Sequence, residues 1–271
     1  MNFMGTKGRW LWLAIVPLVP ASLWACDVTE HRFKGFTAGE YFADTRLVAL
    51  AKAGCEGDAA AVKRLVGEGV DVNGTGTNKM TPLIWAIHCQ NIAGVKALLE
   101  AGANPNQKDN IGLTPFLIAI DYDDQVMLGT LIDHKANLYE VGPGDNSAIV
   151  EAFVQGVDNE KWGNYYLLLD RGIDINHVYG RDLPNLRGIT IARYAAALGR
   201  FDKIIELIER GYNRDLGELA VAMHIHQTAR ELPAWEYKQK LIAILKERGV
   251  PYDKLAQEFD AGDRTPHFEQ Y

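Results

Sequence analysis

The sequence predicts an all-α protein, a solenoid of stacked helix pairs with inter-repeat turns and a helical cap at each end. Three observations predict it. A glycine-led turn recurs along the chain, a threonine-led helix start recurs at a similar interval, and apolar residues between the two follow helical spacing. Of the 271 residues, 48% are hydrophobic and 23% are charged, which is typical of a folded chain.

Residues 1–25 are predicted to be a signal peptide. Lys7 and Arg9 give the start of the chain a positive charge, and residues 10–25 are almost wholly apolar. This apolar stretch is too short for a comfortable bilayer span and contains two prolines. A charged start, a short apolar stretch and a small residue before the cut are typical of a signal peptide.

The residues around the expected cut resemble a bacterial lipoprotein signal, in which the small Ala25 precedes Cys26. The resemblance implies that Cys26 is lipidated and that residues 26–44 form a spacer. Because Asp27 follows the cysteine, it also implies retention in the inner membrane. Trp24 departs from the pattern by its size, so ordinary secretion and an uncleaved anchor stay open as alternatives.

A glycine-led turn divides the rest of the chain into units. Its glycine, or the residue that replaces it, recurs after 33, 33, 37, 39 and 38 residues. A glycine directly after the last turn is a common helix stop, so each occurrence predicts the end of a second helix. The occurrences lie at residues 69–73, 102–106, 135–137, 172–176, 211–213 and 249–251.

A helix start led by threonine or serine follows the same interval. Thr81 is followed 33 residues later by Thr114, and Ser147 comes another 33 residues on. Thr190, the next match, comes ten residues late, and a proline stands directly after the first two threonines. A threonine hydroxyl caps the start of a helix, and proline fits the first position, where no N–H is required.

The unit at residues 77–109 shows how one repeat is built. After the cap at Thr81, apolar residues at helical spacing predict a short first helix, which breaks at residues 90–91. Val95 and Leu98 then share one face of a second helix, and the glycine-led turn ends it.

This pattern resembles the ankyrin repeat, whose signature is a T-P-L-H-x-A helix start, a helix pair and a G-A-x-x-N turn. Ile84 and Leu117 replace the histidine of the signature. The resemblance implies a solenoid in which each unit covers the apolar face of its neighbour and the end units act as caps. The expected units are 45–76 (N-terminal cap), 77–109, 110–139, 140–186, 187–215 and 216–252 (C-terminal cap), followed by a polar tail at 253–271.

Two cysteines remain beside Cys26. The repeat alignment puts Cys55 and Cys89 on adjacent units, one position out of register. Neighbouring helices lie about 8–10 Å apart, whereas a disulfide needs Cα atoms within about 7 Å. A disulfide in an oxidising periplasm and two half-buried thiols therefore both stay open.

The sequence contains no recognised motif of an enzyme, a metal centre or a cofactor site. G-x-S-x-G, H-E-x-x-H, C-x-x-C and phosphate-loop patterns are all absent. We therefore expect no catalytic residues, no metal and no cofactor. The net charge is −7 and becomes 26 − 35 = −9 without the two cations of the signal peptide, which argues against a nucleic-acid partner.

The resemblance implies a protein partner and a chain that is monomeric when free. Ankyrin repeats bind through their turn tips and the exposed side of their first helices. Carried over to this chain, the contact positions are Asn78, Lys79, Trp85, His88, Asp109, Asn110, Ile118, Asp121, Tyr122 and Asp123.

Some of these contact positions allow more than one interpretation. An exposed Trp85 or Ile118 would anchor a partner, although packing of Trp85 against a neighbouring repeat stays open. The acidic run at residues 121–124 forms either a recognition patch, a cation site or a solvated helix end. Tyr179 and Arg181 join the contact positions because they lie on a ten-residue insertion in one turn.

The signal and the repeats together resemble the ankyrin-repeat lipoproteins that act as immunity proteins to phospholipase effectors of type VI secretion. That resemblance implies a bacterial periplasmic protein, lipid-anchored to the inner membrane, that binds and neutralises a secreted lipase. A general cell-envelope ankyrin scaffold or stress-protective adaptor is the alternative that stays open.

Overall fold

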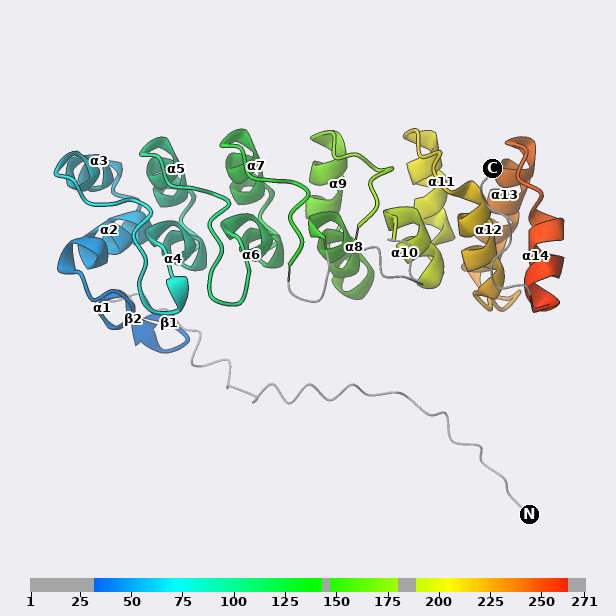
Figure 1. Cartoon of the computed structure of the whole chain (residues 1–271), viewed down its shortest axis with the longest axis horizontal. Helices are drawn as coiled ribbons and strands as arrows, with labels where there is room; N and C mark the ends of the chain where they lie inside the picture. The colour runs from blue at the N-terminus through cyan, green and yellow to red at the C-terminus, as the bar shows by residue number, and fades with distance from the viewer. Residues whose placement is uncertain (1–31, 143–146, 180–188, 263–271) are drawn as a thin grey trace, which may run out of the picture.

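The computed structural model of the chain describes residues 32–142, 147–179 and 189–262, and its helices stack in one row (Figure 1). The all-α solenoid expected from the sequence is confirmed. The predicted signal peptide, the candidate lipidation residue Cys26, Arg181 and the end of the tail lie outside the described residues.

Six helix pairs follow one another within the described residues. In Figure 1 the first helices α4, α6, α8 and α10 lie below their partners α5, α7, α9 and α11. The pairs are α2 (Thr45–Glu56) with α3 (Ala59–Gly67), α4 (Pro82–His88) with α5 (Ile92–Glu100), α6 (Pro115–Asp121) with α7 (Gln125–Asp133), α8 (Ala148–Asn159) with α9 (Gly163–Asp170), α10 (Ile191–Ala197) with α11 (Phe201–Glu209), and α12 (Leu216–Ile225) with α13 (Pro233–Glu247).

Folded segments extend the array at both ends beyond the predicted units. At the start, β1 (Arg32–Phe33) and β2 (Phe36–Thr37) form an antiparallel hairpin that leads into α1 (Ala38–Tyr41). At the other end, α14 (Tyr252–Asp260) packs against α12. The predicted spacer (26–44) and polar tail (253–271) therefore each contain folded segments.

The expected caps start the first helices. The backbone N–H of Ile84 donates to the hydroxyl of Thr81 at 3.1 Å, and that of Leu117 donates to Thr114 at 3.3 Å. A proline occupies the first turn of both helices, where its missing N–H costs nothing. Ser147 holds the same position before α8 but its side chain makes no capping bond.

Asparagine side chains link the turn of one unit to the turn of the next. Asn73 accepts the backbone N–H of Asn104 at 2.7 Å and donates to the carbonyl of Gly102 at 3.2 Å. One unit further on, Asn106 accepts the N–H of Asn137, also at 2.7 Å. These bonds satisfy backbone groups that the irregular turns leave without partners, and they fix the register between units.

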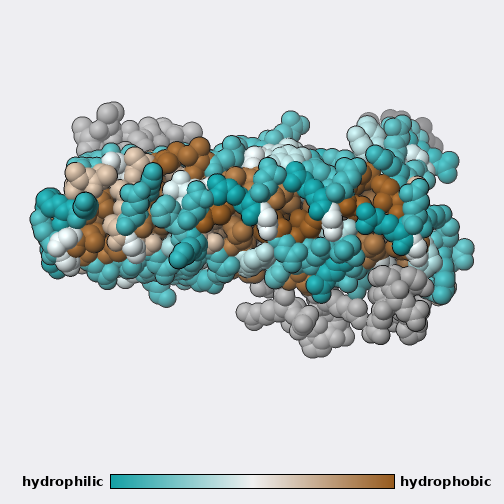
Figure 2. Space-filling view, turned by 90° about the horizontal axis from the view of Figure 1, so that it is seen from above, coloured by the Kyte–Doolittle hydropathy of each residue, from teal (hydrophilic) through white to brown (hydrophobic). Residues whose placement is uncertain are grey.

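The core runs as one continuous cluster along the row of helices. Seen from above, hydrophobic residues form a band along the array that is flanked by hydrophilic side chains (Figure 2). Among the described glycines, the tightest approach joins α5 to α2, where a Cβ atom added at Gly94 would lie 1.6 Å from the carbonyl oxygen of Gly54. Glycine at position 94 therefore sets the distance between the first two units.

A disulfide joins the first two units. Cys55 near the end of α2 bonds to Cys89 at the end of α4, with Cα atoms 5.3 Å apart. Of the two states that the sequence left open, the structure has the bridge. The spacing between helix axes overestimates the Cα separation because the two cysteines face each other across the interface.

No helix within the described residues has the length and the apolar character needed to cross a membrane.

Candidate functional site

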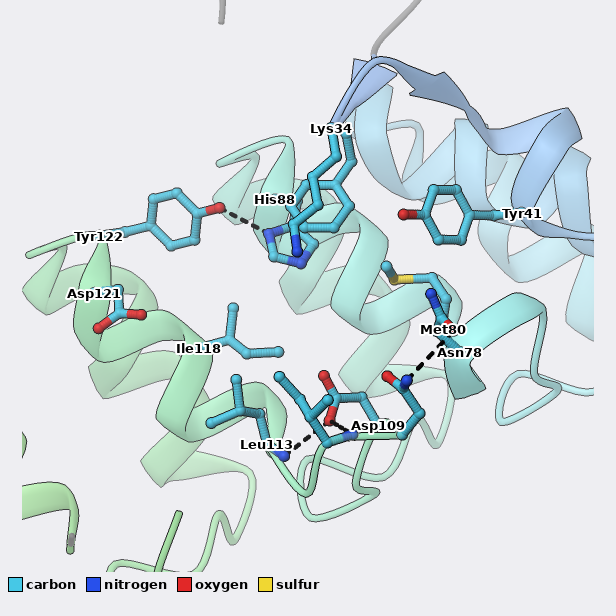
Figure 3. Close-up of a pocket in the computed structure, with 13 residues that line it drawn as sticks. Lys34, Tyr41, Asn78, Met80, His88, Asp109, Leu113, Ile118, Asp121 and Tyr122 are labelled. Carbon is cyan, nitrogen blue, oxygen red and sulfur yellow. Dashed lines mark hydrogen bonds between the residues drawn. The ribbon is translucent and has the colours of Figure 1, made fainter. Parts of the chain in front are cut away.

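A hollow lies where the N-terminal hairpin, the end of α4 and α6 meet (Figure 3). Its volume is about 330 Å³. Two turn tips, at residues 78–80 and 109–113, close its lower side in the view of Figure 3. The lining residues are Phe33, Lys34, Tyr41, Asn78, Met80, His88, Asp109, Asn110, Ile111, Leu113, Ile118, Asp121 and Tyr122.

The inner side of the hollow is apolar. Met80 is 5% exposed, Ile118 is 6% exposed, and Leu113 is partly buried against the core. The Ile118 side chain points into the hollow in Figure 3. This surface offers contact to a hydrocarbon chain rather than to a fully hydrated ion.

Hydrogen bonds hold the two turn tips in place. The backbone N–H of Asn110 donates to the carbonyl of Asn78 at 3.0 Å, and the two side-chain amides are bonded at 3.3 Å. Asp109 accepts the N–H groups of Ile111 and Leu113 through one carboxylate oxygen, each at 2.9 Å. The tips are thus fixed before any partner arrives, which lowers the entropy lost on binding.

His88 and Tyr122 form the upper wall of the hollow. His88 Nδ1 and the Tyr122 hydroxyl are hydrogen-bonded at 2.7 Å, and Phe33 of the hairpin stacks on the imidazole. Burial, and then the nearby charge of Lys34, lower the pKa of His88 to about 4. Burial raises the pKa of Tyr122 to about 12. Both side chains are therefore uncharged at neutral pH.

Asp121 stands at the rim of the hollow, at the end of α6. Partial burial of its carboxyl group, and then the charge of Glu151, raise its pKa. No cationic side chain in the described parts of the chain pairs with it. A carboxylate in this position is stabilised by an incoming positive charge.

Comparison with known proteins identifies the repeat. Residues 47–142 match the family model described as "Ankyrin repeats (3 copies)". The helix pairs from α2 to α7 are therefore similar to ankyrin repeats. Such repeats form scaffolds for protein–protein interaction and are generally not enzymes.

Three known ankyrin proteins are similar to parts of this chain. The ankyrin repeat domain of Bcl-3, a member of the IkappaB protein family, superimposes with a TM-score of 0.52 at 23% identity, covering 74% of this chain and 86% of that domain, and supports the fold alone. The ankyrin repeat domain of human ASB11 superimposes with a TM-score of 0.48 at 21% identity, covering 71% of this chain and 96% of that domain. The ankyrin repeat protein YahD of Escherichia coli (strain K12) is 36% identical over 83 residues, which are 31% of this chain and 41% of YahD.

The hollow gathers many of the contact positions predicted from the ankyrin pattern. Those that line it are Asn78, His88, Asp109, Asn110, Ile118, Asp121 and Tyr122. Lys79, which follows Asn78, and Asp123, in the connection between α6 and α7, do not line the hollow, and Arg181 lies outside the described residues. Turn tips and first helices of two adjacent ankyrin repeats thus converge on one place.

Three of the predicted contact positions are buried, and for Trp85 the structure has the packed state that the sequence left open. Trp85 is 1% exposed because α1 covers it: its ring lies 5.4 Å from Tyr41 and 6.3 Å from Phe42. Ile118 is buried at the inner side of the hollow rather than exposed. Tyr179 is 5% exposed, because its backbone pairs with Ile189 and brings the start of the inserted turn back onto the array.

The hairpin wall of the hollow was not predicted. Phe33, Lys34 and Tyr41 precede the first ankyrin unit, in the segment interpreted as a spacer. Aromatic residues on both sides of Lys34-Gly35 are a short-range signal for a hairpin. Their contact with α4 depends on packing across the chain, which no local pattern indicates.

A second aromatic cluster lies in the middle of the array, and a lysine of the same chain already contacts its rings. The ammonium of Lys203 lies 4.4 Å from the centre of the Trp162 ring and 4.8 Å from that of Tyr166. The Tyr166 hydroxyl donates to Glu206 at 3.2 Å. The cluster therefore joins α9 to α11 and leaves the hollow as the better surface for a partner.

Within the described residues, no group of three or more His, Cys, Asp or Glu side chains is placed to hold a metal ion. The acidic residues at positions 121–124, which begin with the last residue of α6, have separate roles. Asp124 caps α7 by accepting the N–H groups of Val126 and Met127, while Asp121 faces the hollow. The run as a whole is therefore not a cation site in this arrangement.

Proposed function

We propose that this chain is a periplasmic, membrane-tethered ankyrin protein that binds another protein through the hollow, and that it acts as an immunity protein against a secreted phospholipase. The observation that carries the proposal is the hollow itself. It combines an apolar inner side, fixed turn tips and an unpaired carboxylate on the side that ankyrin repeats use for binding.

Two features support export from the cytoplasm. The first 26 residues have the charge, the apolar stretch and the cysteine of a lipoprotein signal. The disulfide between Cys55 and Cys89 is of a kind that persists in oxidising compartments and is rare in the cytosol.

The short connection between the anchor and the fold supports action at the membrane. Phe33, in the wall of the hollow, follows Cys26 by seven residues. Seven residues span at most about 25 Å. A partner held in the hollow would therefore remain close to the bilayer that a phospholipase attacks.

The proposal is tested by protection of living cells. A strain that lacks the gene is grown against sibling cells that deliver a phospholipase by type VI secretion. We expect the strain to lose viability, the wild-type gene to restore it fully, and the Cys26→Ala gene to restore it less at equal protein level. Unchanged viability of the deletion strain would reject the immunity role.

The same strains distinguish the alternative of a general envelope scaffold. For an immunity protein, the loss of viability requires an attacker with an active phospholipase. Equal loss against an attacker whose phospholipase carries an inactive catalytic residue, or under envelope stress alone, would favour the scaffold.

A further inference from the structure

We infer that the hollow receives an arginine side chain of the protein partner, with the hydrocarbon part against the apolar inner side and the guanidinium at Asp121. The inference rests on the proposed function, because it assumes that the hollow is the partner-binding surface. It goes further by naming the chemistry that recognises the partner.

The inner side of the hollow suits a long, unbranched hydrocarbon chain. Met80, Leu113 and Ile118 supply apolar side chains to its lining. An arginine buries its three methylene groups along apolar surface while its charged head stays near water. A short acidic or amide side chain would leave this apolar surface in contact with water.

The charges around the hollow favour a cation. Asp121 has no cationic partner among the described residues, and one oxygen of Asp109 remains outside the two bonds within its own turn. Lys34 of the hairpin is the cation among the lining residues, and it lies beside the uncharged His88. Two carboxylates thus line the hollow with one ammonium.

The walls favour arginine over lysine. Tyr41 lies at the hairpin side with its hydroxyl toward the hollow, whereas Phe33 is already in contact with His88 and with the Lys34 ammonium, and a planar guanidinium packs well against an aromatic side chain such as Tyr41. The side-chain oxygen of Asn110 and the Asp121 carboxylate offer acceptors at different places on the rim. The five donors of a guanidinium serve several acceptors at once, whereas an ammonium is a point charge.

The test uses Nα-acetyl-arginine amide as a probe and the mature chain with Cys26→Ala. Backbone amide shifts are followed by NMR as the probe is added, with the neutral isostere Nα-acetyl-citrulline amide as the control. We expect saturable shifts confined to residues around the hollow with the arginine probe and none with citrulline. Shifts of equal size with citrulline, or shifts scattered over the surface, would overturn the inference.

Matched variants locate the charge that binds. Asp121→Asn should weaken probe binding about five-fold, whereas Glu100→Gln, which removes a carboxylate on α5, should leave it unchanged. Lys34→Ala should tighten binding because it removes the opposing ammonium. Unchanged affinity in Asp121→Asn would overturn the assignment. The probe requires no partner, so a failed probe with cell protection retained would reject the arginine alone.

Discussion

Phe33 lies nearly parallel to the imidazole of His88, with ring centroids 3.7 Å apart and 15° between the planes. The two residues are 55 positions apart in the chain. Their contact turns a hairpin outside the repeat units into a wall of the hollow. It also shields His88 from water.

We predict that protonation of His88 destabilises the fold. The pKa of His88 is about 4 in the folded chain, against 6.5 for an exposed histidine. The unfolded chain therefore binds more protons between these values, so stability falls as the pH drops from about 6.5 toward 4. The loss is roughly 2–3 kcal/mol. Urea unfolding at pH 7 and pH 4.5 measures it, and His88→Gln should remove this part of the pH dependence. Identical pH dependence in the two proteins would contradict the prediction.

Gly94→Ala should destabilise the array by about 3 kcal/mol or more. The added methyl group would meet the carbonyl oxygen of Gly54, which cannot move without separating α2 from α5. Gly67→Ala is the matched control, because a Cβ atom there meets nothing within 4 Å. The control should be neutral or more stable by up to about 1 kcal/mol. Thermal unfolding compares the two, and equal midpoints would show that the interface accepts the methyl group.

Asn106→Ala should lower the free energy of unfolding by about 1–2 kcal/mol. The substitution leaves the backbone N–H of Asn137 and the carbonyl of Lys135 without their partner. Asn159→Ala, which removes an exposed bond to Gln155 within one helix, should cost less than half as much. Chemical denaturation of the two variants provides the measurement. A similar cost for both would mean that the bonds between turns contribute little.

Removal of the disulfide should destabilise the chain by about 3–4 kcal/mol, in the range expected for a bridge that closes a loop of this length. The cysteines are 34 residues apart. The Cys55→Ser, Cys89→Ser double variant is compared with the wild type by thermal unfolding, with and without reductant. Reductant should lower the midpoint of the wild type alone. A midpoint that does not respond in either protein would show that the bridge adds no stability.

Local sequence patterns predicted the repeated parts of the fold. Thr81 and Thr114 cap helices in the structure because their hydroxyl groups act within three residues. Turn tips such as Asn78 and Asn110 reach the hollow because their positions follow from the ankyrin period. These features depend on short-range chemistry and on repetition, which one sequence displays.

Features set by contacts between distant segments were not predicted. Trp85 occupies a position that ankyrin repeats expose, but α1 covers it. Phe33 gained a role only through its contact with His88. The helix α14 buries Tyr252 and Leu255 in a segment whose composition is polar. The few apolar residues of such segments can be assigned to the core only when the surface that they cover is known.

The N-terminal end of the array is reinforced three times, by the hairpin over His88, by the close contact of Gly54 with Gly94 and by the disulfide. Each unit of a solenoid contacts mainly its neighbours, so fraying advances from an end one unit at a time. With one end secured, fraying should start at α14 and reach the hollow last. Amide hydrogen exchange should therefore be slowest in the two units that line the hollow.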